Sequence, residues 1–141
     1  MQAHAPPAVL RSRPPDAEKI TINLGYVDLG QIDLLVAESF YSNRTDFIRT
    51  AIRNQLSAHA DALKQVVARK MLVLGLQQFA AADLEAVRRA GEKLEIRVLG
   101  LASIAEDVTP ELALETIGSI TVLGALHAPP AVKAALAGRL Y

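Results

Sequence analysis

Three polar side chains near the N-terminus have the types and the spacing needed to recognise DNA bases. Lys19, Thr21 and Asn23 alternate with isoleucine or leucine across residues 19–24, so in an extended chain all three project from one face. Lysine can donate to guanine O6 and N7, an asparagine amide can match adenine N6 and N7, and threonine can donate or accept. The pattern predicts a half-buried strand whose polar face contacts bases.

A second polar group, Ser42, Asn43 and Arg44, stands immediately before an apolar helical pattern. Ser42 or Asn43 can cap that helix, and Asp46 in its first turn complements the helix dipole. The unpaired N–H groups of a helix N-terminus also bind anions, so this position suits a phosphate of the DNA backbone. The alternative is that these residues serve only to begin a helix.

The elements that must position these side chains are one strand and two helices. No glycine or proline interrupts the second helix before Gly75, so it is expected to continue through Leu63 and Val67 as a rigid connector. The predicted bounds are about 19–24 for the strand, 28–39 for the first helix, 41–43 for the turn and Asn43 onward for the second helix.

The predicted strand is too short to bury its own apolar face. We therefore expect it to pair with the same strand of a second chain. A two-stranded ribbon of this kind has the width of the DNA major groove, and its polar face would enter that groove. This arrangement makes the homodimer the smallest form able to contact DNA.

The order strand, helix, helix, with KITINL as the strand and SNRTDFIR opening the second helix, resembles the ribbon-helix-helix DNA-binding family, to which the CopG, Arc and MetJ repressors belong. The resemblance covers about the first half of the chain and implies a homodimer through residues 18–60. Gly25 stands where family members commonly have proline, and Phe40 stands where the turn often has glycine. The implied contact residues are Lys19, Thr21 and Asn23 for bases and Ser42, Asn43 and Arg44 for phosphates.

The composition is that of a folded protein without a disulfide or thiolate scaffold. With 141 residues, 51% of them hydrophobic, the chain can bury a core as one domain or two small ones. It has no cysteine, which fits a reducing compartment and removes a ligand that the nickel-responsive members of the resembled family need. Residues 1–70 carry nine basic against seven acidic side chains, and residues 71–141 carry six against eight. The small basic excess lies with the candidate DNA contacts.

The chain divides into three predicted segments. Residues 1–17 contain four prolines and no apolar period, which predicts a disordered arm. Arg11 and Arg13 of this arm could enter a neighbouring minor groove, or the arm is simply a solvated tail. A ribbon-helix-helix domain with its extended second helix is expected over residues 18–70, and a small α/β domain over residues 71–141.

The C-terminal half repeats the tripeptide Val-Leu-Gly at 73–75, 98–100 and 122–124, so that its glycines are 25 and 24 residues apart. Each tripeptide ends a short apolar run that is followed by a loop and a helical pattern, predicted over 82–90, 110–117 and 129–137. This spacing falls within that of leucine-rich-type α/β repeats, although their consensus asparagine is missing. An ordinary α/β domain with right-handed crossovers, or chance, are the alternatives. Terminal repeat units need covering, which favours a higher homo-oligomer through residues 71–141.

The chain has no motif that indicates catalysis, a cofactor or a metal. Gly75, Gly100 and Gly124 each lack the second glycine of a nucleotide-binding loop. Glu106, Asp107 and Glu111 could pair catalytically, but acids near a helix N-terminus need no such role. The three histidines are widely separated in the sequence: His4, His59 and His127. We therefore expect no enzyme activity, no cofactor and no metal site.

The sequence thus predicts an α+β protein that acts as a sequence-specific DNA-binding transcriptional regulator, most simply a repressor, in the form of a dimer or higher oligomer. Two alternatives stay open: an architectural protein that polymerises through its C-terminal repeats, and an antitoxin of a toxin–antitoxin pair. The antitoxin alternative predicts a polar C-terminal tail, whereas residues 71–141 are rich in apolar residues. No signal-peptide pattern or membrane-length apolar run is present. We expect no membrane partner and a cytoplasmic, nucleoid-associated location.

Overall fold

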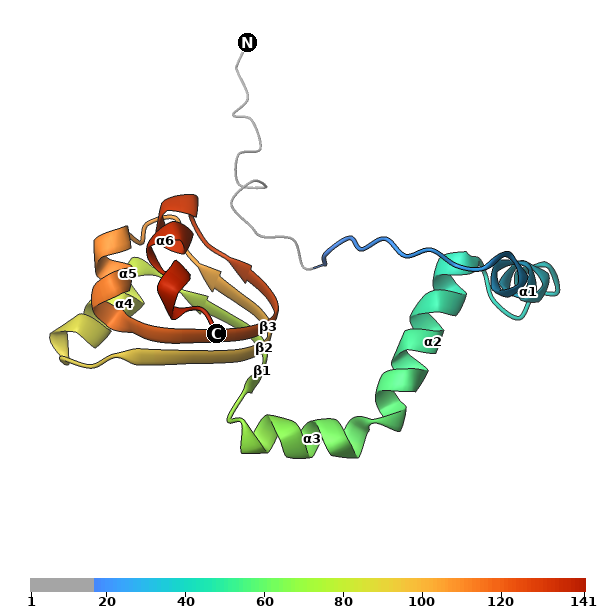
Figure 1. The fold of residues 1–141 in the computed structure, drawn as a ribbon, viewed down its shortest axis with the longest axis horizontal. Coiled ribbons are helices and arrows are strands. Elements are labelled where there is room, and N and C mark those ends of the chain that lie inside the picture. The colour runs from blue at the N-terminus through green and yellow to red at the C-terminus, as the bar shows by residue number, and fades with distance from the viewer. Residues whose placement is uncertain (1–16) are drawn as a thin grey trace, which may run out of the picture. The chain divides into compact units, whose positions relative to one another are not determined.

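The structure is a computed structural model that describes residues 17–141; the predicted arm, with Arg11 and Arg13, lies outside these residues except for its last position. The described chain mixes helices and strands (Figure 1), as the sequence predicted, and divides into two compact units, residues 17–66 and 67–141. No helix in these residues is both long and apolar enough to cross a bilayer. The elements are α1 (Tyr26–Ala37), α2 (Arg44–Ala58), α3 (Ala60–Arg69), β1 (Val73–Phe79), α4 (Ala81–Arg89), β2 (Leu94–Ile104), α5 (Pro110–Thr116), β3 (Ile117–His127), α6 (Pro130–Ala135) and a 3-10 turn (Ala137–Arg139).

The N-terminal unit is two helices joined by a tight turn. α1 begins at Tyr26, two residues earlier than predicted. The ring of Tyr41, in the turn, meets that of Phe47, in α2, edge to face with the centroids 5.0 Å apart, a geometry that aromatic pairs favour. Ile32 is the one buried side chain among residues 17–66. This unit therefore has almost no core of its own in a single chain.

The end of α1 uses a backbone conformation that normally belongs to glycine. Ser39 has φ 68°, the left-handed region in which a side chain is strained. Its N–H donates to Val36 O at 3.0 Å, and the next N–H, that of Phe40, donates to Leu35 O at 2.9 Å. These two bonds are the pair that closes a helix whose following residue is left-handed. The turn needs no glycine at Phe40, because Ser39 is the residue that adopts this conformation.

The predicted continuous second helix is wrong. α2 ends at Ala58, and His59 departs from helical geometry with φ −106° and ψ 12° before α3 begins at Ala60. His59 N–H bonds Leu56 O at 3.0 Å, the shorter spacing of a tightened turn. Neither glycine nor proline marks the interruption, so residue type alone did not reveal it.

The C-terminal unit is a three-stranded parallel sheet in the order β1-β2-β3. The three Val-Leu-Gly tripeptides lie side by side in register: Val73 pairs with Val98 and Val98 with Val122, and the leucines and glycines follow in the same way. Helices α4, α5 and α6 connect or follow the strands, within one or two residues of their predicted bounds. Figure 1 shows the strands curving around these helices.

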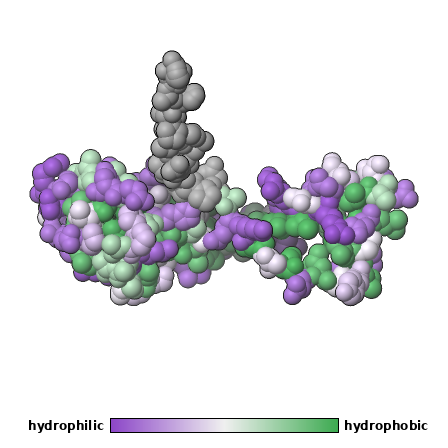
Figure 2. All heavy atoms as spheres, turned by 90° about the horizontal axis from the view of Figure 1, so that it is seen from above, coloured by the Kyte–Doolittle hydropathy of each residue, from purple (hydrophilic) through white to green (hydrophobic). Residues whose placement is uncertain are grey.

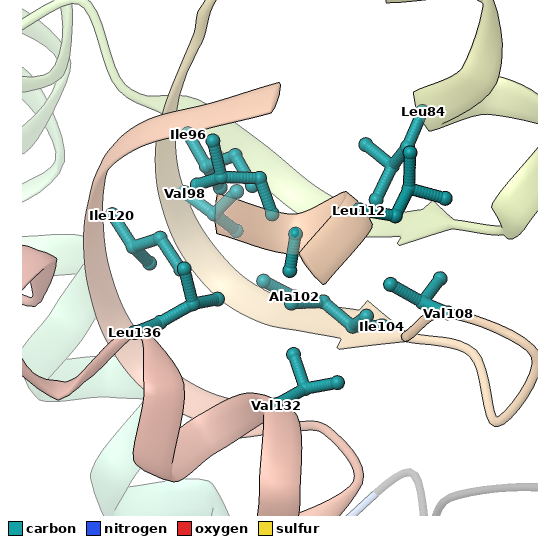
Figure 3. Close-up of a cluster of buried hydrophobic side chains, with 12 residues drawn as sticks. Leu84, Ile96, Val98, Ala102, Ile104, Val108, Leu112, Ile120, Val132 and Leu136 are labelled. Atoms are coloured by element: carbon teal, nitrogen blue, oxygen red, sulfur yellow. The ribbon is translucent and has the colours of Figure 1, made fainter. Parts of the chain in front are cut away.

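The core of this unit lies between the sheet and the helices (Figure 3). β2 contributes Ile96, Val98, Ala102 and Ile104, and these side chains point toward those of the helices. The helices contribute Leu84 from α4, Leu112 from α5, and Val132 and Leu136 from α6 and the residue after it. The core has one buried polar side chain, Thr116, whose hydroxyl donates to Leu112 O at 2.7 Å. Residues 67–141 thus bury a continuous apolar cluster within a single chain.

Candidate nucleic-acid interface

The three predicted base-contact residues lie on a segment without secondary structure in the single chain. Lys19, Thr21 and Asn23 are all exposed, and residues 18–25 form neither a helix nor a strand. The segment leads directly into α1 at Tyr26. Strand geometry would place the three side chains on one face, and only pairing with another strand would hold that geometry.

The apolar side chains of this segment are also uncovered. Ile20, Ile22 and Leu24 are 74%, 62% and 40% exposed, and each forgoes part of the roughly 1.5–3 kcal/mol that full burial of such a side chain provides. Figure 2 shows apolar residues at the surface of the N-terminal unit, at the right of that view. On the two helices, exposed examples are Leu34, Ile52 and Leu56. A single copy of this unit therefore exposes the surface from which a core would be built.

Asn43 is the N-cap of α2, one of the two positions, with Ser42, that the sequence allowed. Its Oδ1 accepts from Asp46 N–H at 2.8 Å, and Asp46 Oδ2 accepts in return from Ser42 N–H at 2.9 Å. This reciprocal pair satisfies two backbone donors at the start of the helix. The N–H groups of Arg44 and Thr45 come first in the helix and have no acceptor within it. These two donors, at the positive end of the helix dipole, are the groups that an anion could bind.

The Arg44 side chain is held by a carboxylate of the preceding helix. Nε donates to Asp33 Oδ1 at 2.8 Å and Nη2 donates to Asp33 Oδ2 at 2.9 Å, a bidentate pair that joins α1 to the start of α2. The hydrogen bonds lower the pKa of Asp33 and raise the pKa of Arg44. Both side chains are about half exposed, so the pair orients the helices more than it stabilises them. Of the guanidinium nitrogens, only Nη1 lies outside these bonds.

Asp33 is the residue of this region that sequence reasoning missed. It is eleven positions from Arg44, and no helical or strand period relates two residues at that distance on different elements. An exposed Asp in a helix is common, so its type gave no signal either. Arg49 and Arg53, one turn apart on α2, are exposed and have no ion pair within residues 17–141.

Of the acidic residues near the second Val-Leu-Gly unit, Asp107 acts at the start of α4, together with Asp83 of that helix. Asp83 Oδ2 accepts from Ala80 N–H at 2.8 Å, and Asp107 Oδ1 accepts from Ala81 N–H at 3.1 Å. Both carboxylates thus satisfy backbone donors at the N-terminus of α4. They line a hollow of about 530 Å³ at the C-terminal ends of β1 and β2. At α5 the N-cap is Thr109, whose Oγ1 accepts from Leu112 N–H at 3.1 Å.

The sequence matches the Ribbon-Helix-Helix transcriptional regulator family over residues 15–133. The chain belongs to this family. The family is one of DNA-binding transcriptional regulators, and the match runs through β3 into α6, well past the N-terminal half that carried the resemblance. No curated protein and no solved structure matches the chain.

Proposed function

We propose that this protein is a sequence-specific DNA-binding transcriptional regulator whose residues 18–60 form an intertwined homodimer. In that dimer the two segments 19–24 pair into a ribbon. Lys19, Thr21 and Asn23 face the bases of the major groove. Repression is the simplest mode of action, because stable occupation of a promoter requires no further activity.

One observation carries this proposal beyond family membership. The alternate apolar side chains of the segment, Ile20, Ile22 and Leu24, are exposed in the single chain, although their spacing is that of a strand with one buried face. Only Ile32 is buried among residues 17–66. A partner chain that paired with the segment and packed on α1 and α2 would cover the apolar side chains of the segment and those of the two helices. Folding and dimerisation of this unit are then one event.

The start of α2 is the proposed phosphate site. Ser42 and Asn43 shape it through Asp46, and the N–H groups of Arg44 and Thr45 are available for a phosphate oxygen. The Asp33–Arg44 pair sets the orientation of this helix end against α1. Arg44 would therefore contact phosphate through its backbone N–H or its Nη1, and its side chain acts mainly by positioning.

Base recognition by the ribbon is tested by replacing one side chain. Selection of bound sequences from a random DNA pool first supplies the preferred site. Asn23→Ala should then cost roughly 1–3 kcal/mol of binding free energy on that site and relax the preference at one position per half-site. Binding to scrambled DNA should barely change. An equal loss on both DNAs would show that the Asn23 side chain does not contact a base.

For residues 71–141 we propose a domain of three strand–helix repeats that assembles dimers into a higher oligomer. The in-register tripeptides and the similar connections support this proposal. The proposed domain boundaries are 18–70 and 71–141. A cytoplasmic, nucleoid-associated location follows from DNA as the partner. The antitoxin alternative loses support, because a tail that folds on a toxin would lack a core of its own, whereas residues 67–141 have one.

A further inference from the structure

The free edge of β1 has none of the features that keep edge strands apart. β1 pairs with β2 on one side only, and its sequence VLGLQQF contains no charged residue and no proline. Natural edge strands use charges, prolines or bulges to prevent pairing with other chains. Leu74 and Leu76 are 74% and 56% exposed, whereas their neighbours in β2, Leu99 and Leu101, are half-buried. On its outer side β1 thus has no neighbouring strand within residues 17–141, and the side chains of Leu74 and Leu76 are exposed.

The opposite edge of the sheet, on β3, has no neighbouring strand within residues 17–141 over the matching length, and one of its carbonyls, Leu126 O, accepts from Lys133 Nζ at 3.1 Å. Leu140 forms a parallel bridge with Ile120, and Tyr141 N–H donates to Ile120 O at 2.8 Å. These contacts occupy only the start of β3. From Val122 onward this edge has no neighbouring strand in the described part of the chain, and Leu123 is 51% exposed.

The register of the sheet shows that a second β1 would begin just beyond this bridge. β1 starts at Val73, which aligns through Val98 with Val122. The residue two positions before Val73, Met71, has φ 55°, a left-handed conformation that turns the incoming chain away from the strand direction. A β1 strand placed on β3 in the same register therefore begins at Val122. It does not overlap the position beside Ile120 that Leu140 occupies.

The glycines of the three tripeptides show that the β1 edge and the β3 edge are complementary to each other. Gly75, Gly100 and Gly124 have φ 122°, 140° and 120°. A Cβ added to Gly100 would overlap the carbonyl oxygen of Gly75, and one added to Gly124 would overlap that of Gly100. At Gly75 the same position is open, with no atom of residues 17–141 within 4 Å. Each glycine thus makes room for the carbonyl of the glycine before it, and the room at Gly75 is unfilled.

We infer that β1 of one copy pairs in parallel with β3 of a second copy, head to tail, with Gly75 opposite Gly124. The Gly124 carbonyl of the second copy fills the space at Gly75, and Leu74 lies beside Leu123. The contact is heterologous, so it leaves a free β1 and a free β3 at the two ends and can extend indefinitely. It specifies the surface behind the assembly proposed for residues 71–141, and it depends on no DNA contact.

Charge variants of the full chain test the pairing at each edge separately. Sedimentation velocity of the unaltered protein should reveal species larger than a dimer that grow with concentration. Leu74→Glu, on the β1 edge, and Leu123→Glu, on the β3 edge, should each give dimers only. A mixture of the two variants should recover larger species, because the first keeps its β3 edges free and the second keeps its β1 edges free.

The outcomes separate head-to-tail pairing from its alternatives. If β1 paired with β1 of another copy, the Leu123→Glu variant would still form larger species, and mixing it with the Leu74→Glu variant would not increase their size. A protein that stays dimeric at every concentration would overturn the inference. Binding of Leu123→Glu to a single DNA site should equal that of the unaltered protein, so a failure of DNA binding and a failure of stacking are observed independently.

Gly75→Ala tests the glycine contact itself. The added Cβ would occupy the space assigned to the Gly124 carbonyl, and assembly should be lost while the dimer remains. Gly91→Ala is the matched control, because Gly91 also has a positive φ, 71°, with nothing within 4 Å, but lies after α4 and away from the edge. Equal assembly of the two variants would contradict the contact.

The register can be tested directly because the chain has no cysteine. Leu74→Cys and Leu123→Cys chains, mixed and oxidised, should form a disulfide-linked pair, since directly opposed residues on adjacent strands are about 5 Å apart and within disulfide range. Leu76→Cys mixed with Leu123→Cys is the control. Its residues are two positions out of register, roughly 8 Å apart, beyond that range. Equal cross-linking of both mixtures would refute the register.

Discussion

A methyl group added at Gly100 should damage the C-terminal unit far more than one added at Gly75. Both residues have a positive φ, so an alanine at either position carries backbone strain of roughly 1–3 kcal/mol. At Gly100 the new Cβ also overlaps the Gly75 carbonyl oxygen and lies 3.0 Å from its carbon. Relief requires β1 and β2 to separate by roughly 1.4 Å, because unbonded carbon and oxygen atoms rest about 3.5 Å apart.

That separation sets the size of the difference. An N–H···O bond stretched by about 1.4 Å is no longer a hydrogen bond, and each one lost costs roughly 1 kcal/mol. With the two bonds that flank the glycine affected, Gly100→Ala should cost about 2 kcal/mol more than Gly75→Ala, or roughly 3–5 kcal/mol in total.

Urea unfolding followed by circular dichroism measures this difference. Both variants should be made in the Leu123→Glu background, so that contacts between copies do not contribute. For an m value of roughly 1–3 kcal/mol per molar urea, the Gly100→Ala midpoint should lie about 1 M below that of Gly75→Ala. The N-terminal unit is identical in both variants, so its unfolding does not contribute to the difference between their midpoints. Equal midpoints would mean that the carbonyl contact between adjacent glycines does not constrain the sheet.

Three further changes test the N-terminal unit. Ile22→Lys should unfold it, because the substitution leaves an unpaired charge in the proposed shared core; a folded monomer in sedimentation and circular dichroism would contradict the intertwined dimer. Ser39→Gly should raise the free energy of unfolding by about 1 kcal/mol by relieving the strain at φ 68°, whereas Ser39→Ala, which keeps the strain, should not. The pKa of Asp33 is lowered by its bond with Arg44, so its stabilising contribution is present above the unfolded pKa of about 3.9 and is lost as pH falls through the lower folded pKa. Urea midpoints of Asp33→Asn and the unaltered protein should therefore converge in acid, and a constant gap would contradict this.

The sequence by itself determined the features that depend on residues close together in the chain. An N-cap at Ser42 or Asn43 follows from short polar side chains before an apolar helical pattern, and the structure shows that it is Asn43. The three Val-Leu-Gly tripeptides were found as a repeated spacing in the sequence. They lie in register because each begins or continues the strand of its own unit, and these strands pair at the same positions. The family was evident from the order of one strand and two helices, and the match over residues 15–133 confirms it.

Tertiary structure alone decided the features that depend on distant residues. The Asp33–Arg44 pair joins two helices whose packing angle no sequence period encodes. The interruption at His59 follows no glycine or proline. At Gly100 and Gly124 the place of the missing side chain is taken by the carbonyl of the neighbouring strand, so the role of Gly100 is visible only when β1 lies beside β2. In each case the deciding contact joins parts of the chain that only the folded backbone brings together.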